Sequence, residues 1–359
     1  MSTRVLALPK YDRLGASSRL RTLQFIPALQ DNSIELDVRP LLDDAYITGL
    51  YRGRISRLGV ARGYASRLRQ IMRAGSYDVV WTEKELLPWL PDSIELSLLP
   101  AETRLVVDYD DAVFHRYDQH RSRLVRRIFG RKIDAVMRRA DLVLVGNSYL
   151  ADRALSAGAR RVEWLPTVID LDRYPLPPQR EGAGEIIIGW IGTPSTAPYL
   201  RLVAPVLERL RERYPVRCVA IGARSDQLFG TPFEAWEWQE NTEVAMISSF
   251  DIGVMPLPDE LFERGKCGYK LIQYMACGLP VVASPVGANS TIVVEDINGY
   301  LADSHDQWDS ALSRLTENSA LRRRLGQVGR LQVEETYSLQ AQAPRLADLL
   351  RSVGEGDRT

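Results

Sequence analysis

Residues 265–287 read GKCGYKLIQYMACGLPVVASPVG: a loop with two glycines and two lysines, an amphipathic segment and a valine-rich run. A helix is expected at 269–277, because Gly278 can end it and Pro280 opens the next extended run. A buried strand, FDIGVMPL (250–257), precedes the loop. Strand, helix and strand in this order predict a βαβ unit of a parallel sheet.

The same alternation runs along the whole chain and predicts an α/β protein with two doubly wound domains. A stretch rich in proline and glycine, 170–185, interrupts the alternation and is the expected linker. We therefore expect domains at 1–172 and 173–337, followed by a C-terminal helical segment, 338–359. Open α/β sheets bind ligands at the carboxyl ends of their strands, so the site is expected in a cleft between those ends. The expected strands are 4–9, 78–83, 104–110, 142–148, 185–192, 217–223, 250–257 and 279–285, and the expected helices are 17–30, 54–73, 121–139, 149–157, 198–213, 242–248, 269–277, 306–316, 319–335 and 338–351.

Composition restricts the function classes. Lys plus Arg and Asp plus Glu are both 46, so the net charge indicates no polyanionic partner. Cys218, Cys267 and Cys277 lack metal-ligand spacing and are expected to be reduced thiols. The sequence shows no signal peptide and no apolar run long enough to span a membrane, so a cytoplasmic protein, at most peripheral on the inner face of the membrane, is expected.

The glycine-broken loop before 269–277 is a candidate anion site. Backbone amides at the helix start, with Lys266, Gly268 and Lys270 around them, favour negative charge, and a diphosphate would fit. The alternative is that Gly265 and Gly268 shape a tight loop and the lysines are solvated.

This loop, with DIGVMPL (251–257) before it and VEDINGYL (294–301) after it, resembles the donor-binding region of family-4 glycosyltransferases, the group 1 retaining enzymes with the GT-B fold. Segments 4–21, 147–174 and 186–195 extend the resemblance over nearly the full length. The resemblance implies two Rossmann-like domains facing a central cleft, the first for the acceptor and the second for the nucleotide sugar. The segment 338–359 is a candidate to cross back to the first domain, as in the resembling fold.

The activity that the resemblance implies is a retaining transfer from a nucleotide-diphosphate sugar to a saccharide or lipid-linked acceptor. It needs no metal and no cofactor, since the nucleotide sugar is a co-substrate. The pathway implied is the synthesis of a cell-surface polysaccharide, such as O-antigen, capsule or exopolysaccharide. Two alternatives stay open: a nucleotide-sugar epimerase or hydrolase on the same fold, and a catalytically silent protein that binds nucleotide sugars.

The resemblance also assigns donor-binding residues. The family's second glutamate, which holds the ribose, is replaced here by Gln273, and the position eight residues before it is Gly265, so the nearest carboxylate for the sugar is Glu263. An arginine often found after the second domain's first strand is missing, because Thr193 follows Gly192. The donor-binding candidates are Gly15, Ala16, Arg19, Gly192, Thr193, Arg224, Trp238, Glu263, Lys266, Gly268, Tyr269, Lys270 and Gln273.

Acidic residues follow the expected strand 104–110, in VVDYDDAVFHRYD (106–118). By the resemblance, Asp110 or Asp111 orients the acceptor and His115 contacts the sugar, which makes these three the catalytic candidates. One alternative takes Asp108 and Asp110 as an Asp-x-Asp pair for a divalent ion. Another takes Asp111 as a helix N-cap and the rest as solvated.

Two further patterns have competing interpretations. By the resemblance Trp238 stacks on the nucleotide base, but Trp236 and Trp238 are two apart and core packing is favoured. From 45 to 77 the chain has no acid, and a second basic run spans 116–139. Such segments suit an anionic membrane surface or a pyrophosphate-linked lipid acceptor, or else form a solvated helix face. No nucleic-acid partner is expected, because no recognition module is present. The arginines of the first basic run are Arg52, Arg54, Arg57, Arg62, Arg67, Arg69 and Arg73.

Overall fold

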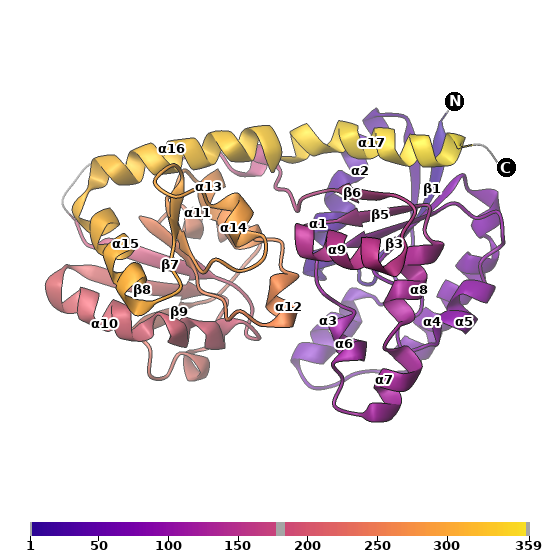
Figure 1. The fold of residues 1–359 in the computed structure, drawn as a ribbon, viewed down its shortest axis with the longest axis horizontal. Helices are drawn as coiled ribbons and strands as arrows, with labels where there is room; N and C mark the ends of the chain where they lie inside the picture. The colour runs from indigo at the N-terminus through magenta and orange to yellow at the C-terminus, as the bar shows by residue number, and fades with distance from the viewer. Residues whose placement is uncertain (1, 177–183, 357–359) are drawn as a thin grey trace. The chain divides into compact units, whose positions relative to one another are not determined.

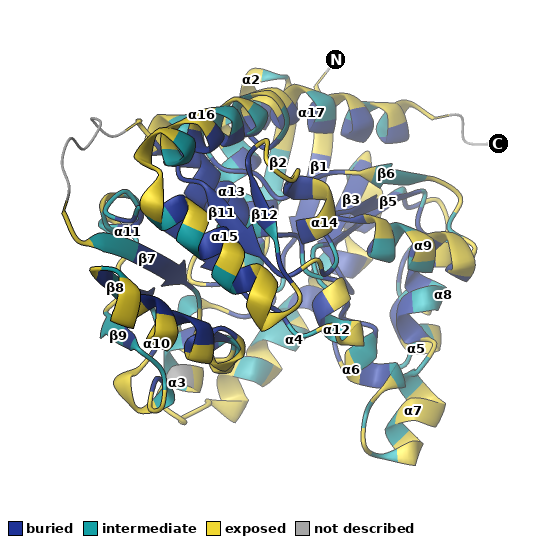
Figure 2. Cartoon of the chain, turned by 60° about the vertical axis from the view of Figure 1, so that its left-hand side comes forward, coloured by how far each residue is buried: buried dark blue, intermediate teal, exposed yellow. Residues whose placement is uncertain are grey.

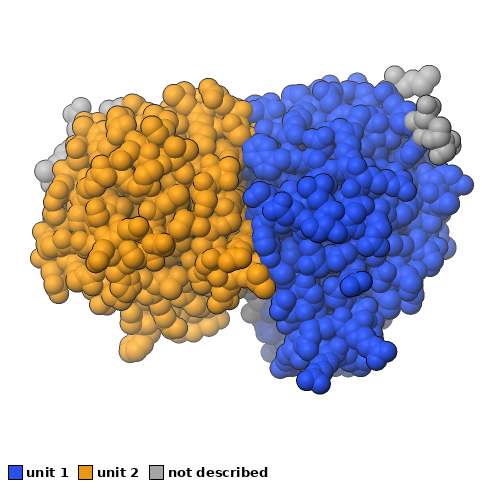
Figure 3. Space-filling view, viewed as in Figure 1, with its two compact units in different colours: residues 1–168, 339–359 blue, residues 169–338 orange. Residues whose placement is uncertain are grey.

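The computed structural model describes residues 2–176 and 184–356 and divides the chain into two compact units (Figure 3). Unit 1 consists of residues 1–168 and 339–359, and unit 2 consists of residues 169–338. Residues 177–183 of the expected linker lie outside the described residues. Each unit is built on a six-stranded sheet whose paired strands all run parallel, which confirms the α/β class with two doubly wound domains.

The sheet of unit 1 has the strand order β2-β1-β3-β4-β5-β6. Helices α2 and α17 lie along one face of it (Figure 1), and both sides of its central strands are buried. This double burial explains the continuous apolar runs that marked these strands in the sequence. The strands are β1 (Thr3–Leu8), β2 (Ile34–Val38), β3 (Val79–Glu83), β4 (Leu105–Tyr109), β5 (Leu142–Val145) and β6 (Val162–Trp164), and the helices are α1 (Ala16–Arg21), α2 (Ile26–Asp31), α3 (Asp44–Tyr51), α4 (Arg57–Met72), α5 (Asp92–Ser97), α6 (His115–Asp118), α7 (Arg123–Phe129), α8 (Lys132–Arg139), α9 (Ser148–Ala157) and α17 (Leu339–Glu355), with 3₁₀ turns η1 (Leu23–Phe25) and η2 (Ala74–Ser76).

The ends of α9 show how local sequence sets these helices. The Asn147 side chain accepts a hydrogen bond from the Leu150 N–H, which satisfies one of the first amides of the helix. Gly158 ends it with a φ of 86°, a left-handed conformation that glycine adopts without steric cost. At the far end of the chain, Leu346 and Leu350 of α17 are buried in the core of unit 1.

The sheet of unit 2 has the order β12-β11-β10-β7-β8-β9. Its strands are buried, whereas α10 and α15 turn exposed faces outward (Figure 2). The strands are β7 (Ile186–Ile191), β8 (Val216–Ile221), β9 (Phe233–Trp236), β10 (Ile252–Met255), β11 (Val281–Ala283) and β12 (Gly299–Leu301), and the helices are α10 (Ala204–Arg213), α11 (Glu243–Ile247), α12 (Leu261–Arg264), α13 (Tyr269–Ala276), α14 (Asn289–Ile292), α15 (His305–Glu317) and α16 (Ser319–Thr336), with 3₁₀ turns η3 (Leu171–Arg173), η4 (Ala197–Leu202) and η5 (Ser225–Gln227).

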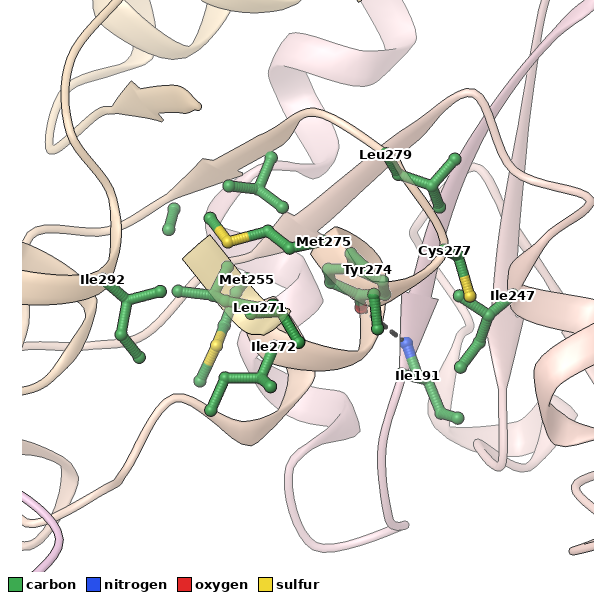
Figure 4. Packing of buried hydrophobic residues seen from close by; sticks show 14 of the residues in the cluster. Ile191, Ile247, Met255, Leu271, Ile272, Tyr274, Met275, Cys277, Leu279 and Ile292 are labelled. Atoms are coloured by element: carbon green, nitrogen blue, oxygen red, sulfur yellow. Dashed lines mark hydrogen bonds between the residues drawn. The ribbon is translucent and has the colours of Figure 1, made fainter. Parts of the chain in front are cut away.

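Helix α13 is the centre of packing in unit 2, and almost all of it is buried (Figure 4). The Tyr274 hydroxyl accepts a hydrogen bond from the Ile191 N–H of β7 at 2.9 Å and donates one to the Val254 carbonyl of β10 at 3.3 Å. A tyrosine on the helix therefore connects two strands of the sheet. On its other side α13 packs against α16, where Gly326 faces the backbone of Gly278.

All three cysteines are buried and free, in agreement with the expectation of reduced thiols. Burial raises the pKa of Cys218 and of Cys277 to about 12, so both are thiols at neutral pH. Within the described residues, no helix has both the length and the apolar character needed to cross a bilayer.

The close contact between α16 and the end of α13 predicts that one methyl group added at position 326 lowers stability. A Cβ at position 326 would lie 1.8 Å from the Gly278 carbonyl oxygen, so the two backbones would have to separate. We expect Gly326→Ala to lower the free energy of unfolding by about 1–3 kcal/mol, the usual cost of overpacking. Gly75→Ala is the matched control, because a Cβ there meets nothing within 4 Å. Urea unfolding of both variants measures the effect, and equal stabilities would contradict this account.

Candidate functional site

At the carboxyl edge of the unit 2 sheet, glycines let backbone and side chains approach closely. A Cβ at Gly222 would lie 2.3 Å from the Gly192 carbonyl oxygen, and one at Gly192 would lie 2.9 Å from Cε of Lys270. Gly222 also has a φ of 82°. The ends of β7 and β8 and the first turn of α13 therefore meet at one place, which brings the predicted residues Gly192 and Lys270 together.

The first turn of α13 begins at Gly268, whose φ is 68° and which has no side chain to cap the helix. The ammonium of Lys270 lies 5.5 Å from the centre of the Trp190 ring, and that of Lys266 lies 5.0 Å from the Phe262 ring. Both lysines and Tyr269 are half-buried. Two half-buried cations beside a helix start are groups that an anion site would use, and binding of a diphosphate here stays a prediction.

The other donor candidates of unit 2 have definite partners in the structure. Glu263 is buried and accepts a hydrogen bond from the Tyr199 hydroxyl at 2.5 Å. The hydroxyl of Thr193 lies 2.8 Å from that of Ser195. Arg224 is exposed and forms an ion pair with Asp226 at 2.7 Å, so its charge is already matched.

Gln273 lies in a buried hydrogen-bond network that sequence reasoning missed. Its amide donates to the Tyr174 hydroxyl at 3.0 Å and to the Glu243 carboxylate at 2.9 Å. Glu243 also accepts from Tyr174 at 3.0 Å and from the Trp238 indole N–H at 2.6 Å. Trp238 and Trp236 both pack against the core, as the spacing favoured. The carboxylate at this place comes from Glu243, and no short motif points to it.

At the carboxyl edge of the unit 1 sheet, the glycine loop follows β1. Gly15 is buried before α1, and a Cβ there would lie 2.3 Å from Cβ of Tyr11. Ala16 is exposed, and the Arg19 guanidinium donates to the Arg13 carbonyl at 3.2 Å. The loop is therefore tightly folded, and the role of Gly15 and Ala16 in donor binding stays a prediction.

Each carboxylate of the Asp108–Asp110 pair has a cation of its own. Arg21 binds Asp108 with both its Nε and its Nη2, the shortest distance being 2.6 Å. Burial raises the pKa of Asp108 to about 6 in spite of Arg21, which still leaves it ionised at neutral pH. For Asp110, burial is outweighed by Lys84, 2.8 Å away, and by Arg21, which together lower its pKa to about 2.

Lys84 organises this edge, and sequence reasoning did not single it out. It is buried, has a φ of 65°, and contacts Asp110, Glu83 at 3.4 Å and the Ser17 hydroxyl at 3.1 Å. Burial opposes its charge, but the two carboxylates raise its pKa above the usual value. The left-handed backbone of a non-glycine residue costs of order 1–3 kcal/mol and is typical of functional places.

His115 and Asp111 lie beside this edge. The ring nitrogens of His115 are 2.8 Å from Asp118 and 2.8 Å from the Tyr149 hydroxyl, so both already have partners. Asp111 lies close enough to Lys84 to raise the pKa of that lysine. The N-cap position of α6 is occupied by Phe114, so the interpretation of Asp111 as the cap of this helix is wrong. Within the described residues, no group of three or more His, Cys, Asp or Glu is arranged around a possible metal position.

Two cations of the basic runs lie in the interior of unit 1. Arg67 is buried and donates to backbone carbonyls, including those of Pro9 at 2.7 Å and Leu86 at 3.2 Å. Lys132 is buried between Glu85 and Glu95, each 2.7 Å away. The prediction of a membrane-facing or solvated arginine run is therefore wrong for Arg67, because its guanidinium binds backbone carbonyls in the interior of unit 1.

Comparison with known proteins identifies the family of unit 2. Residues 185–318 match the family model of glycosyl transferases group 1. The D-inositol 3-phosphate glycosyltransferase of Xylanimonas cellulosilytica is 28% identical over 203 residues, which are 48% of this chain and 47% of that protein. This chain therefore matches about half the length of that relative.

Solved structures match almost the whole chain. The sucrose-phosphate synthase of Thermosynechococcus elongatus has a TM-score of 0.72 at 15% identity, covering 98% of this chain and 99% of that one. Anabaena HepE, solved in complex with UDP, has a TM-score of 0.70 at 15% identity, covering 98% and 100%. These neighbours are GT-B proteins, and the fold predicted from the resemblance is confirmed.

The ion pair at Lys84 leads to a prediction about stability. We expect Lys84→Met to lower the free energy of unfolding by about 3–5 kcal/mol, because Asp110 would remain buried without its cation. Methionine has the same backbone restriction as lysine, so the change isolates the charge. The double variant Lys84→Met/Asp110→Asn should recover part of the loss. Arg224→Gln, which breaks an exposed pair, is the control and should be neutral. Chemical unfolding measures all three, and a neutral Lys84→Met would contradict the assignment.

Proposed function

We propose that this protein is a retaining glycosyltransferase, because residues 185–318 match the group 1 glycosyl transferases and the fold is GT-B. It moves a sugar from a nucleotide-diphosphate sugar to a saccharide or lipid-linked acceptor, without a metal or other cofactor. Unit 2 holds the nucleotide sugar, and unit 1 holds the acceptor.

The observation that carries the proposal is the contact of Lys270 with Gly192 beside the start of α13. The glycines at positions 192 and 222 let Trp190, Lys270 and the backbone pack closely at this edge, which holds Lys270 beside the helix start. Lys270 and Lys266 supply the positive charge. Breaking the sugar–diphosphate bond leaves negative charge on the diphosphate, and fixed cations beside it stabilise that charge in the transition state.

The transfer requires a group that takes the proton of the acceptor hydroxyl. Asp110 has a pKa of about 2, so it is a weak base at neutral pH, and its contact with Lys84 suits it to hold an acceptor hydroxyl in position. Asp111 and His115 stand beside it and contact acceptor or sugar. The leaving phosphate takes the proton of the acceptor hydroxyl. Transfer with retained configuration therefore depends on the donor diphosphate and not on a side-chain base.

The donor is proposed to be a UDP-sugar. This rests on Anabaena HepE, a neighbour solved with UDP and with UDP-glucose. Trp238 is proposed to lie beside the base, and Gln273 with Glu243 beside the ribose, because these residues form one network next to the diphosphate edge.

The acceptor is proposed to be part of a cell-surface polysaccharide and to be met at the inner face of the cytoplasmic membrane. Exposed apolar side chains accompany arginines on two parts of unit 1: Ile55 and Leu58 at the start of α4, and Leu124 and Ile128 on α7. Each cation close to an anionic bilayer contributes on the order of 1 kcal/mol, and the apolar groups can enter the interface. The exposed arginines on these two parts are Arg52, Arg54, Arg57, Arg62, Arg121, Arg123, Arg126 and Arg127.

A second candidate is a protein that binds nucleotide sugars without turnover. The observation in its favour is that Gln273 replaces an acid and is only 2% exposed within its own network. This function would be identified if the protein binds the nucleotide but releases no nucleotide from any nucleotide sugar, with or without acceptors.

The donor site predicts a magnesium-independent ligand. In a thermal-shift screen of UDP, GDP, dTDP, ADP and CDP, we expect UDP to stabilise the protein equally with and without magnesium, because bound ligand stabilises the native state by mass action. Lys270→Ala should weaken UDP binding roughly 10- to 100-fold, since hydrogen bonds to charged groups contribute about 1.5–3 kcal/mol. Arg201→Ala, an exposed cation of the same unit, is the control. Unchanged affinity in Lys270→Ala would contradict the diphosphate role, and no response to any nucleotide would contradict the transferase.

The apolar and basic surface predicts membrane binding in vitro. We expect the protein to sediment with vesicles of phosphatidylglycerol and phosphatidylcholine but not with phosphatidylcholine alone, and to be released by 0.5 M salt because screening weakens surface charge attraction. Leu58→Ser/Leu124→Ser should bind less. Leu155→Ser is the matched control, since Leu155 and Leu58 are both 61% exposed and Leu155 lies on α9. Equal sedimentation of all forms would argue against this surface.

A further inference from the structure

A cavity of about 480 Å³ opens at the amino edge of the unit 2 sheet, the edge opposite to the one that carries Gly192 and Lys270. Its described lining belongs entirely to unit 2 and comes from the residues directly before β10 and β11, the end of α13 and one side of α16. Cavities of this size are typical of small-molecule sites. The proposed donor site uses the other ends of the same strands and does not account for this cavity.

The cavity has an apolar floor and an apolar rim. The floor is formed by Phe250, Cys277 and Leu279, all of which are buried. At the rim, Leu176 is 57% exposed and Leu331 is 56% exposed. A ligand with an apolar part would remove these leucines from water while it covers the floor, which favours binding.

One side of α16 gives the cavity its shape. The residues of α16 that line it begin at Ser319 and end at Glu334, and they recur at a spacing of three or four. This spacing describes one side of a helix, and the stretch covers about 22 Å along the helix axis. The cavity therefore follows the helix, and a long unbranched chain fits it better than a compact ring.

Two of the three arginines in the lining have a carboxylate close to them. Arg330 forms an ion pair with Glu334 at 2.6 Å. Arg322 donates to the Leu315 carbonyl at 2.6 Å, and burial lowers its pKa while the nearby Asp251 acts in the opposite direction. These two arginines are thus balanced by the two acids of the lining.

Arg323 is the third arginine and gives the lining an excess of positive charge. It is exposed, and within residues 2–176 and 184–356 it forms no hydrogen bond or ion pair. It precedes Leu331 by eight residues on α16, which is about 12 Å along the helix. A cation thus stands toward one end of an apolar groove, and the exposed leucine stands farther along it.

We propose that this cavity binds a medium-chain fatty carboxylate. The carboxylate pairs with Arg323, because a guanidinium can donate two parallel hydrogen bonds to its oxygens. The chain lies along α16, covers Leu279 and reaches Leu331 and Leu176. This site goes beyond the proposed transferase and does not depend on it, since none of its residues lies at the carboxyl edge of the sheet.

The test is calorimetric titration of the full chain with octanoate below its micellar concentration. We expect one octanoate to bind per chain, at least tenfold more tightly than octan-1-ol, which has the chain without the charge, whereas acetate should not bind. Arg323→Gln should weaken octanoate binding about tenfold, because hydrogen bonds to charged groups contribute about 1.5–3 kcal/mol. Leu331→Ser should also weaken it. Arg324→Gln is the matched control, an exposed arginine of the same helix that does not line the cavity.

The variants also separate this cavity from the apolar surface of unit 1. Leu58→Ser/Leu124→Ser should bind octanoate as the wild type does, because both leucines lie in the other unit. Loss of binding in that variant, with binding unchanged in Arg323→Gln and Leu331→Ser, would overturn the proposal. So would a wild type that binds no octanoate, or one that binds octan-1-ol equally well.

Discussion

Both sheets pair their strands in parallel, and this pairing determines where the loops of each unit meet. In a parallel sheet every strand ends at the same edge, so the first residues after β1, β3 and β4 are neighbours although they are far apart in the chain. The same holds for the residues after β7, β8 and β9. A ligand that contacts one such edge can therefore meet several loops at once.

The two edges use this constraint in different ways. The edge of unit 1 is built from buried charges, since Arg21 pairs with Asp108 and Lys84 with Asp110. Taking such charges out of water is costly, so these pairs fix geometry more than they add stability. At the edge of unit 2, Gly192 and Gly222 have no side chains and therefore allow backbones to touch. One edge thus holds polar groups in place by ion pairs, and the other packs Lys270 closely against the backbone at Gly192.

Strands and helices with strong patterns were predictable, and weaker ones were not. The apolar runs of β1 and β10 indicated their strands directly, because both faces are buried. By contrast β2, with the sequence IELDV, lies at the end of the sheet order, half-buried, and its mixed polarity hid it. Of the site, Gly268 and Lys270 were predictable from the loop and helix of 265–287, and Gly192 from the segment 186–195, whereas Gly222 was not predicted. Lys84 and Glu243 were not predictable, because their roles depend on partners distant in sequence, as in the hydrogen bond of Tyr174 with Glu243.

The network at Gln273 explains a departure from the resembling family in physical terms. The Gln273 amide nitrogen is 2.9 Å from a Glu243 oxygen that also accepts from Tyr174. A glutamate at position 273 would place two carboxylates in direct contact in a buried place, where one of them would have to bind a proton. With glutamine there, the amide donates to Glu243, and the pair keeps a single negative charge. Gln273 and Glu243 therefore belong together. A carboxylate still lies beside the start of α13, but Glu243 of a different helix, α11, provides it.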